Sequence, residues 1–125
     1  MPSVVKFESD GDVLVARILE TRLMEDAAIG RFHAEVVAGL GKKEDPNLLI
    51  DFSHVQFLSS SALGALLRIH KKCKEYKVSL KLCSISPDIY EVFKITNLVK
   101  VFDIYDDEAA AYQAVKKKGG FFFRG

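Results

Sequence analysis

Three consecutive serines, Ser59, Ser60 and Ser61, are the residues of this chain best placed to do chemistry. They follow a short apolar run at 48–50 that stops at Asp51, as a buried strand does when it reaches the edge of a sheet. An apolar helical pattern begins directly after the serines. Hydroxyls at a helix start beyond the end of a central strand occupy the place where open α/β sheets tend to bind ligands or carry out chemistry.

As a nucleophile, Ser60 would need a base and an orienting acid, for which His54 and Asp51 are the candidates in the same stretch. The chain has no G-x-S-x-G elbow around this serine. No residue near His54 is predicted to orient its ring. We therefore predict that the protein is not an enzyme and has no catalytic residue. On spacing alone, the ordinary function of serines before a helix is to cap it.

The remaining candidate ligands show no metal-site spacing. The three histidines lie far apart in the sequence, at His33, His54 and His70, and the two cysteines are Cys73 and Cys83. We predict no metal site and no cofactor, and we expect buried free thiols rather than a disulfide. This pattern favours a reducing, cytoplasmic location.

The composition predicts one globular domain. The chain has 125 residues, 49% of them hydrophobic and 28% charged, with a formal net charge of +1. This charge gives no electrostatic case for nucleic-acid binding. No apolar run approaches the roughly 18 residues of a membrane span. We assign residues 1–118 to the domain and residues 119–125 to a short tail rich in glycine and phenylalanine.

The elements that must position the serines are predicted from local patterns. Runs at 4–7 and 13–19 flank an Asp-Gly pair and predict an antiparallel hairpin. Residues 20–25 are read as a connection. The remaining pattern predicts helices near 26–40, 60–76, 87–97 and 106–118, and strands at 48–51, 78–82 and 101–105. In the second helix, Leu63, Leu66, Leu67 and Cys73 are expected to share a buried face. The order predicts an α/β fold with a mostly parallel sheet and about four helices.

The segment 51–64, D-F-S-H-V-Q-F-L-S-S-S-A-L-G, resembles the signature of the STAS domain of anti-sigma-factor antagonists, roughly D-L-S-x-V-x-F-M-D-S-S-G-L-G. Residues 83–87, C-S-I-S-P, are similar to a second stretch of the family pattern. The same holds for Val92-Phe93, for Asn97-Leu98 and for residues 101–105. The resemblance covers most of the chain, and its order of elements agrees with the order predicted from periodicity.

The resemblance implies a phosphorylation switch. In the family, an anti-sigma factor that is also a serine kinase phosphorylates the first serine of the motif, and a serine phosphatase resets it. By position, the acceptor here is Ser60, with Ser61 as the second choice. The implied partner-binding residues are those of the motif and of the connection after the second strand: Ser59, Ser60, Ser61, Ala62, Gly64, Thr21, Arg22 and Leu23. The physics agrees, because a helix N-terminus suits a phosphate.

Three positions depart from the family pattern. The acid that usually precedes the serine pair is Ser59, and the glycine that follows is Ala62. The connection that usually reads G-x-L-D is T-R-L-M at residues 21–24. Ser59 can cap a helix but cannot act as a base near neutral pH. A second hypothesis is therefore a binding or scaffold subunit that is not phosphorylated, in a stress-signalling or lipid-transport complex.

The end of the chain is the one feature that neither the fold nor the resemblance explains. Phe121, Phe122 and Phe123 follow two glycines. Leaving three adjacent phenylalanines in water is costly. Two interpretations stay open: local packing or a disordered end, and an anchor that docks into a second copy of the chain or a partner.

Overall fold

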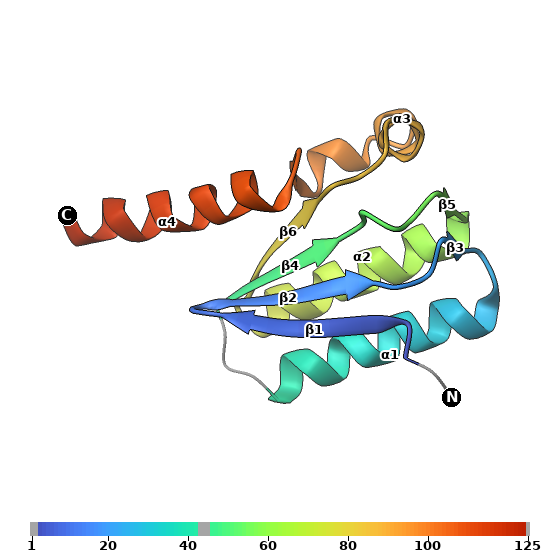
Figure 1. The fold of residues 1–125 in the computed structure, drawn as a ribbon, viewed down its shortest axis with the longest axis horizontal. Coiled ribbons are helices and arrows are strands. Elements are labelled where there is room, and N and C mark those ends of the chain that lie inside the picture. Colours follow the sequence, from blue (N-terminus) through green and yellow to red (C-terminus); the bar gives the residue numbers. More distant parts are fainter. Residues whose placement is uncertain (1–2, 43–45, 125) are drawn as a thin grey trace.

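The computed structural model describes residues 3–42 and 46–124 (Figure 1). A five-stranded sheet in the order β1-β2-β4-β6-β7 forms its centre. The strands are β1 Val5–Asp10, β2 Val13–Ile18, β4 Asn47–Asp51, β6 Ser79–Cys83 and β7 Asp103–Tyr105. The β1-β2 pair is antiparallel and the other three pairs are parallel. This confirms the predicted α/β fold with its antiparallel hairpin.

The hairpin turn forms where the Asp-Gly pair predicts it. Gly11 has a φ of +60°, which glycine adopts at no steric cost. The turn sets the register Asp10↔Val13 through Val5↔Ile18. Alternation then sends Leu14, Ala16 and Ile18 to the face of the larger core, while Val13 and Val15 join the smaller core on the other face.

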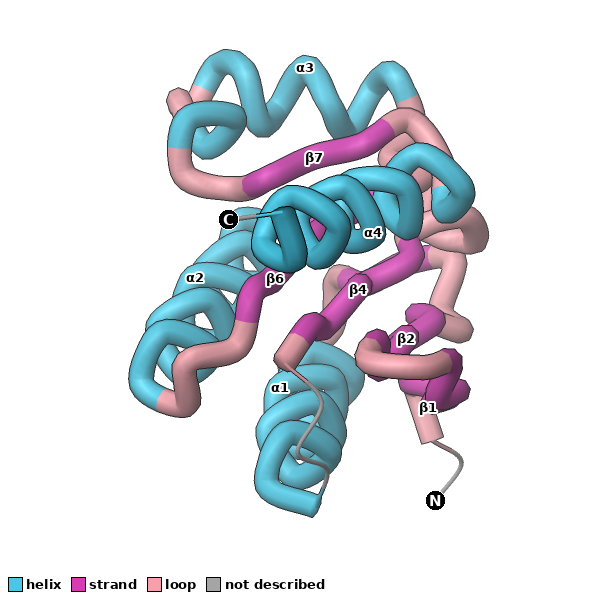
Figure 2. Tube along the Cα trace, turned by 90° about the vertical axis from the view of Figure 1, so that its left-hand side faces the viewer, coloured by secondary structure: helices cyan, strands magenta, loops and turns pink. Residues whose placement is uncertain are grey.

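Four α-helices surround the sheet: α1 Asp26–Lys42, α2 Ser60–Glu75, α3 Pro87–Ile95 and α4 Glu108–Arg124, with a 3₁₀ turn at Leu98–Lys100. Helices α1 and α2 lie side by side on one face, and α4 crosses the opposite face (Figure 2). Two helix starts follow their sequence signals: Ser86 Oγ accepts from the Ile89 N–H, and Asp107 Oδ1 accepts from the Ala110 N–H.

The structure corrects one predicted core residue. The buried face of α2 consists of Ala62, Leu63, Ala65, Leu66, Ile69 and Cys73. Leu67 is 38% exposed, contrary to the prediction. The sheet lies under the stripe that contains Leu66 and Ile69, and at 100° per residue Leu67 turns out of that stripe toward water. Both cysteines are free and buried, as predicted.

The last helix is longer than predicted. Helix α4 continues to Arg124 rather than stopping at the lysines 116–118. Glycine costs a helix only about 1 kcal/mol, much less than proline, so Gly119 and Gly120 need not end it. The division of the chain after residue 118 stays a prediction. The side chains of Phe121, Phe122 and Phe123 lie outside the described residues, so the anchor hypothesis stays a prediction too.

Candidate functional site

The first of the three serines is committed to the fold. Ser59 has extended backbone angles (φ −89°, ψ 166°), and its Oγ accepts a hydrogen bond from the Ala62 N–H at 3.2 Å. Its carbonyl also accepts from the Leu63 N–H at 3.1 Å. These are the contacts of an N-cap, which satisfies donors that the first helical turn would otherwise leave unpaired.

The next two serines present their hydroxyls to solvent. Ser60 begins α2, and both Ser60 and Ser61 are exposed. Among the hydrogen bonds of the described residues, none uses either hydroxyl. The first turn of α2 contains no acidic residue, so no carboxylate offsets the positive end of the helix dipole there. A negative group added at this point would meet favourable potential.

A second, two-stranded sheet brings the connection after β2 beside the serines. Strand β3, Arg22–Leu23, pairs in parallel with β5, Phe57–Leu58. The Thr21 carbonyl accepts from the N–H groups of Gln56 and Phe57, at 2.8 and 3.1 Å. One step further along, the Ser59 N–H donates to the Leu23 carbonyl at 3.2 Å. Residues 20–25 were predicted as a connection, but the structure forms a strand at Arg22–Leu23, and this strand is one wall of the site.

The sequence-predicted binding residues divide into two groups. Leu23 and Ala62 are buried, at 0% and 1% exposure, so their side chains support the site from inside. Thr21, Arg22, Ser60 and Ser61 are exposed, while Ser59 and Gly64 are half-buried. A side chain at Gly64 would meet Arg68, since a Cβ there would lie 3.7 Å from Arg68 Nη1. Only the exposed residues have side chains that a partner can contact directly.

Two exposed residues of this wall were not predicted from the sequence. The Arg22 guanidinium lies over the ring of Phe57, with Cζ 4.7 Å from the ring centroid. Phe57 is 47% exposed and Met24 is 41% exposed. Large apolar side chains so close to exposed serines provide contact area for a protein partner. Phe57 belongs to the quoted motif, but no local pattern predicts its exposure, because a period of two would place it on the same face as the buried Val55.

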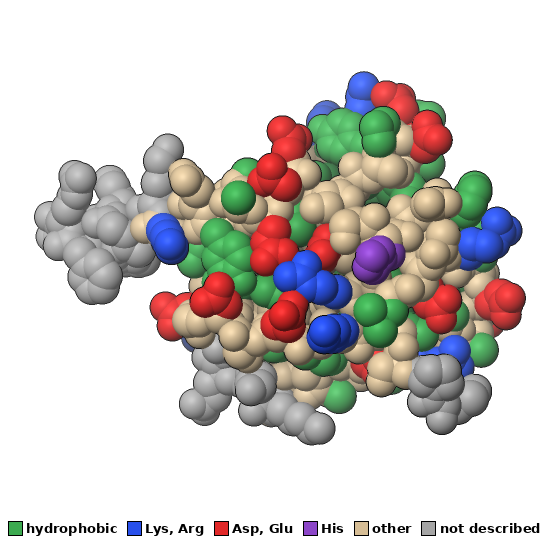
Figure 3. Space-filling model, in the orientation of Figure 1, with side chains coloured by type: hydrophobic (Ala, Val, Ile, Leu, Met, Phe, Trp, Pro, Cys, Tyr) green, Lys and Arg blue, Asp and Glu red, His purple; other side chains and the backbone are tan. Residues whose placement is uncertain are grey.

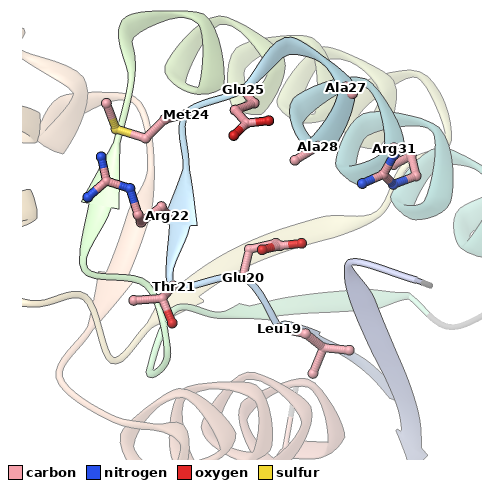
Figure 4. Close-up of a pocket in the computed structure, with 9 residues that line it drawn as sticks. All are labelled: Leu19, Glu20, Thr21, Arg22, Met24, Glu25, Ala27, Ala28 and Arg31. Atoms are coloured by element: carbon pink, nitrogen blue, oxygen red, sulfur yellow. The ribbon is translucent and has the colours of Figure 1, made fainter. Parts of the chain in front are cut away.

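A cavity of about 440 Å³ lies between the segment that follows β2, which includes β3, and the first turns of α1 (Figure 4). Its lining is mixed in charge and polarity: Leu19, Glu20, Thr21, Arg22, Met24, Glu25, Ala27, Ala28 and Arg31. Figure 4 shows Glu20 extending toward the side of Arg31, whereas Arg22 extends to the opposite side, beside Met24. Acidic and basic side chains are also intermixed on the face drawn in Figure 3. This face presents no field of one sign.

Asp51 is engaged elsewhere. Its carboxylate is buried and accepts from Arg17 Nη1 at 2.6 Å, from the Ser53 N–H at 2.9 Å and from Ser53 Oγ at 3.1 Å. His54 is exposed, and no hydrogen bond joins it to Asp51 in the described part of the chain. The hydrogen bonds that the hydrolase interpretation needs are not formed here.

The other potentially reactive groups are unremarkable. Burial raises the pKa of both Cys73 and Cys83 to about 11, which makes these thiols unreactive near neutral pH. Within residues 3–42 and 46–124, no group of three or more histidine, cysteine or acidic side chains could hold a metal ion. No helix in the same residues is long and apolar enough to cross a membrane.

Comparison with known proteins identifies the family. The model of the STAS domain matches residues 4–111 of the chain. This chain belongs to the STAS domain family. A Bordetella bronchiseptica protein that bears the name anti-sigma factor antagonist BtrV is 27% identical over 94 residues, which are 75% of this chain and 80% of the relative. The resemblance found in the sequence is thereby confirmed.

Solved structures agree with the STAS assignment. An anti-sigma-factor antagonist (STAS) domain protein from Planctomyces limnophilus is 25% identical, with a TM-score of 0.78 over 88% of this chain and 96% of that one. The phosphorylated form of SpoIIAA, a Bacillus cell fate determinant, has a TM-score of 0.65 at 17% identity, over 88% of this chain and 98% of that one. At that identity SpoIIAA shows the fold alone. In this chain, the two positions that depart from the family's serine motif, Ser59 and Ala62, lie at the start of α2.

Proposed function

We propose that this STAS domain is an anti-sigma-factor antagonist that works by partner switching in the cytoplasm, with Ser60 as its phosphate acceptor. The observation that carries the proposal is that the hydroxyl of Ser59 is used within the described part of the fold whereas the hydroxyl of Ser60 is not. Ser59 caps α2 through its hydroxyl, while Ser60, at the first position of the helix, is exposed with its hydroxyl free of any hydrogen bond to the described residues. Ser61 is the second choice.

The unphosphorylated protein binds an anti-sigma factor that is also a serine kinase, and so releases the sigma factor. The docking surface consists of the exposed residues around the start of α2: Thr21, Arg22, Met24, Phe57, Ser60 and Ser61. It combines apolar contact area with polar groups, as protein interfaces do. In this proposal the chain is a substrate of the kinase and not itself a catalyst.

Phosphorylation ends the interaction. The kinase transfers the γ-phosphoryl group of ATP to Ser60 Oγ; the hydroxyl proton is lost and ADP leaves. The product carries about −1.5 to −2 charges at neutral pH in the middle of the docking surface. Burying that charge under a partner without matching cations is costly, so the complex dissociates. A serine phosphatase restores the hydroxyl by hydrolysing the phosphate ester.

A second candidate is a constitutive binding or scaffold subunit. The observation that favours it is Ser59, which stands where the family pattern has an acid and whose hydroxyl is already used as a cap. In that case the surface binds its partner without being modified.

One experiment separates the two functions. The protein is incubated with its cognate anti-sigma factor kinase and ATP, and the phosphopeptides are mapped by mass spectrometry. We expect one phosphate on Ser60, lost in Ser60→Ala and kept in Ser59→Ala. Ser60→Asp should weaken binding to the kinase by at least about tenfold, a change of about 1.4 kcal/mol. Absence of label together with unchanged binding by Ser60→Asp would favour the scaffold.

A further inference from the structure

Among the described residues no carboxylate pairs with Arg22, a cation on the strand β3 that is paired with the segment just before the proposed phosphate acceptor. Its guanidinium contacts the ring of Phe57 and forms no salt bridge or hydrogen bond with the residues that the structure describes. The two acids of the adjacent cavity, Glu20 and Glu25, do not pair with it. Such an arginine can offer its five N–H donors to a new anion.

Strand pairing places Arg22 next to the start of α2. Arg22 is paired with Phe57, and the chain then reaches Ser60 after Leu58 and Ser59. The bond from the Ser59 N–H to the Leu23 carbonyl holds the two segments together immediately before Ser60. In an α-helix each Cα–Cβ bond tilts toward the helix N-terminus. The Cα–Cβ bond of Ser60 is therefore tilted back toward the residues that precede α2, which include β5 and its partner β3.

The nearby residue types leave the position free for an anion. Ser59 and Met24 are uncharged, and the first turn of α2 has no acid. Glu20 and Glu25 line the same cavity as Arg22 but form no salt bridge with it, so a phosphate on Ser60 would meet a guanidinium that no described carboxylate already holds.

We propose that Arg22 is the receiver of the phosphate on Ser60, and that it leaves the Phe57 ring when it binds this phosphate. The inference rests on the proposed function, because it concerns the phosphorylated form of the same site. A guanidinium binds phosphate through two parallel charge-assisted hydrogen bonds, which are stronger than its contact with a solvent-exposed ring. Arg22 therefore binds the phosphate in preference to the Phe57 ring.

Binding of the phosphate by Arg22 changes the docking surface in two ways. The phosphate introduces negative charge at Ser60, and the departure of Arg22 uncovers the face of Phe57. A partner that fits Arg22 stacked on Phe57 loses both features at once. The unphosphorylated and phosphorylated surfaces thus differ in shape as well as in charge, without any rearrangement of the backbone.

Arg68 is the competing arginine, and its geometry is less favourable. It lies two turns along α2 from Ser60, and its Nη1 lies over Gly64. Because this nitrogen reaches back to Gly64, four helical residues, about 6 Å along the axis, still separate it from Ser60. The Cα–Cβ bond of Ser60 tilts toward the helix N-terminus and therefore away from Arg68. Arg68 is therefore a matched control: an arginine exposed near the same serine but on the wrong side of it.

The test uses full-length protein in which phosphoserine is incorporated at position 60 during translation, so that no kinase is needed. The ³¹P resonance of the phosphate is followed by NMR between pH 4 and pH 8 in three proteins: the otherwise wild-type phosphoprotein, Arg22→Met and Arg68→Met. Circular dichroism spectra check that all three are folded. The midpoint of the second ionisation of a phosphoserine ordinarily lies at about pH 6.

We expect the midpoint of the parent phosphoprotein to lie about one pH unit below that of Arg22→Met, since a nearby cation favours the dianion. Arg68→Met should keep the parent midpoint. Equal midpoints for the parent and Arg22→Met, or a rise in Arg68→Met alone, would overturn the inference. Failure of the kinase to label Ser60 would instead count against the proposed function and would leave this titration unchanged.

Discussion

Two arginines close together in the sequence occupy opposite electrostatic situations. Arg17 at the end of β2 pairs with Glu8 at 2.6 Å, Asp51 at 2.6 Å and Glu108 at 2.8 Å, and so connects three strands to α4. These bonds raise its pKa further above an already high value. Arg22 on β3 has only an aromatic ring beneath it among the described residues. The charge of Arg17 is balanced by acidic residues within the fold, whereas the guanidinium of Arg22 remains available at the surface.

The difference separates residues that hold the domain together from residues that it displays. Asp51 is the one buried acid among the residues that the structure describes, and it depends on Arg17 for its countercharge. No buried group in the described part of the chain depends on Arg22 in this way. Function can therefore use Arg22 and its neighbours with little effect on stability.

The largest expected effect comes from exchanging each arginine for methionine. Arg17→Met should lower the free energy of unfolding by about 2 to 4 kcal/mol, because it leaves the Asp51 carboxylate buried and unpaired. Arg22→Met should lower it by less than about 1 kcal/mol, the value of an exposed cation–π contact. Urea titrations followed by circular dichroism measure both. Equal losses would contradict the contrast between the two arginines.

The same contrast applies, at smaller size, to adjacent serines. Ser59→Ala should cost about 1 kcal/mol of stability because it removes the N-cap of α2. Ser60→Ala should change stability by less than about 0.5 kcal/mol, since its hydroxyl forms no hydrogen bond within the described residues. Thermal and urea unfolding of both variants test this. A loss in Ser60→Ala as large as that in Ser59→Ala would place Ser60 in the structural group.

The smallest effect concerns pH. Burial, and then the charge of Lys74, lower the pKa of His70, whose ring packs edge-to-face on Phe102 at 5.3 Å. The unfolded state therefore binds more protons, so stability should decline as the pH falls through the range near 6.5 where an unfolded histidine titrates. His70→Gln should flatten this decline in urea titrations at pH 7.5 and 5.5.

The Arg17 cluster should respond at lower pH. The hydrogen bond and charge of Arg17 lower the pKa of Glu8, so the contribution of this pair is present at neutral pH and disappears only in the acid range. For the His70 prediction, the contradicting result is a His70→Gln variant that loses stability between pH 7.5 and 5.5 as steeply as the parent protein. In that case a group other than His70 titrates in this range.

Much of the architecture could be predicted because its causes are local. The Asp10-Gly11 turn, the Ser86 cap and the alternation of apolar residues act over a few neighbouring positions. Leu67 was misassigned because a helical period alone does not show which edge of the stripe the sheet covers. The pairing of β3 with β5 was missed because two residues carry no period.

The serine motif was visible in the sequence, but the separate functions of its members were not. The sequence by itself determined the order of strands and helices along the chain, the mostly parallel character of the sheet, the helix starts and membership of the STAS family. Only the tertiary structure shows that Ser59 caps α2 and that Leu23 is buried. It also shows that Arg17 is paired with acidic residues, whereas Arg22 lies over Phe57. The physical reason is that burial and charge pairing depend on groups that folding brings together from distant parts of the chain, whereas turns and caps depend on neighbours.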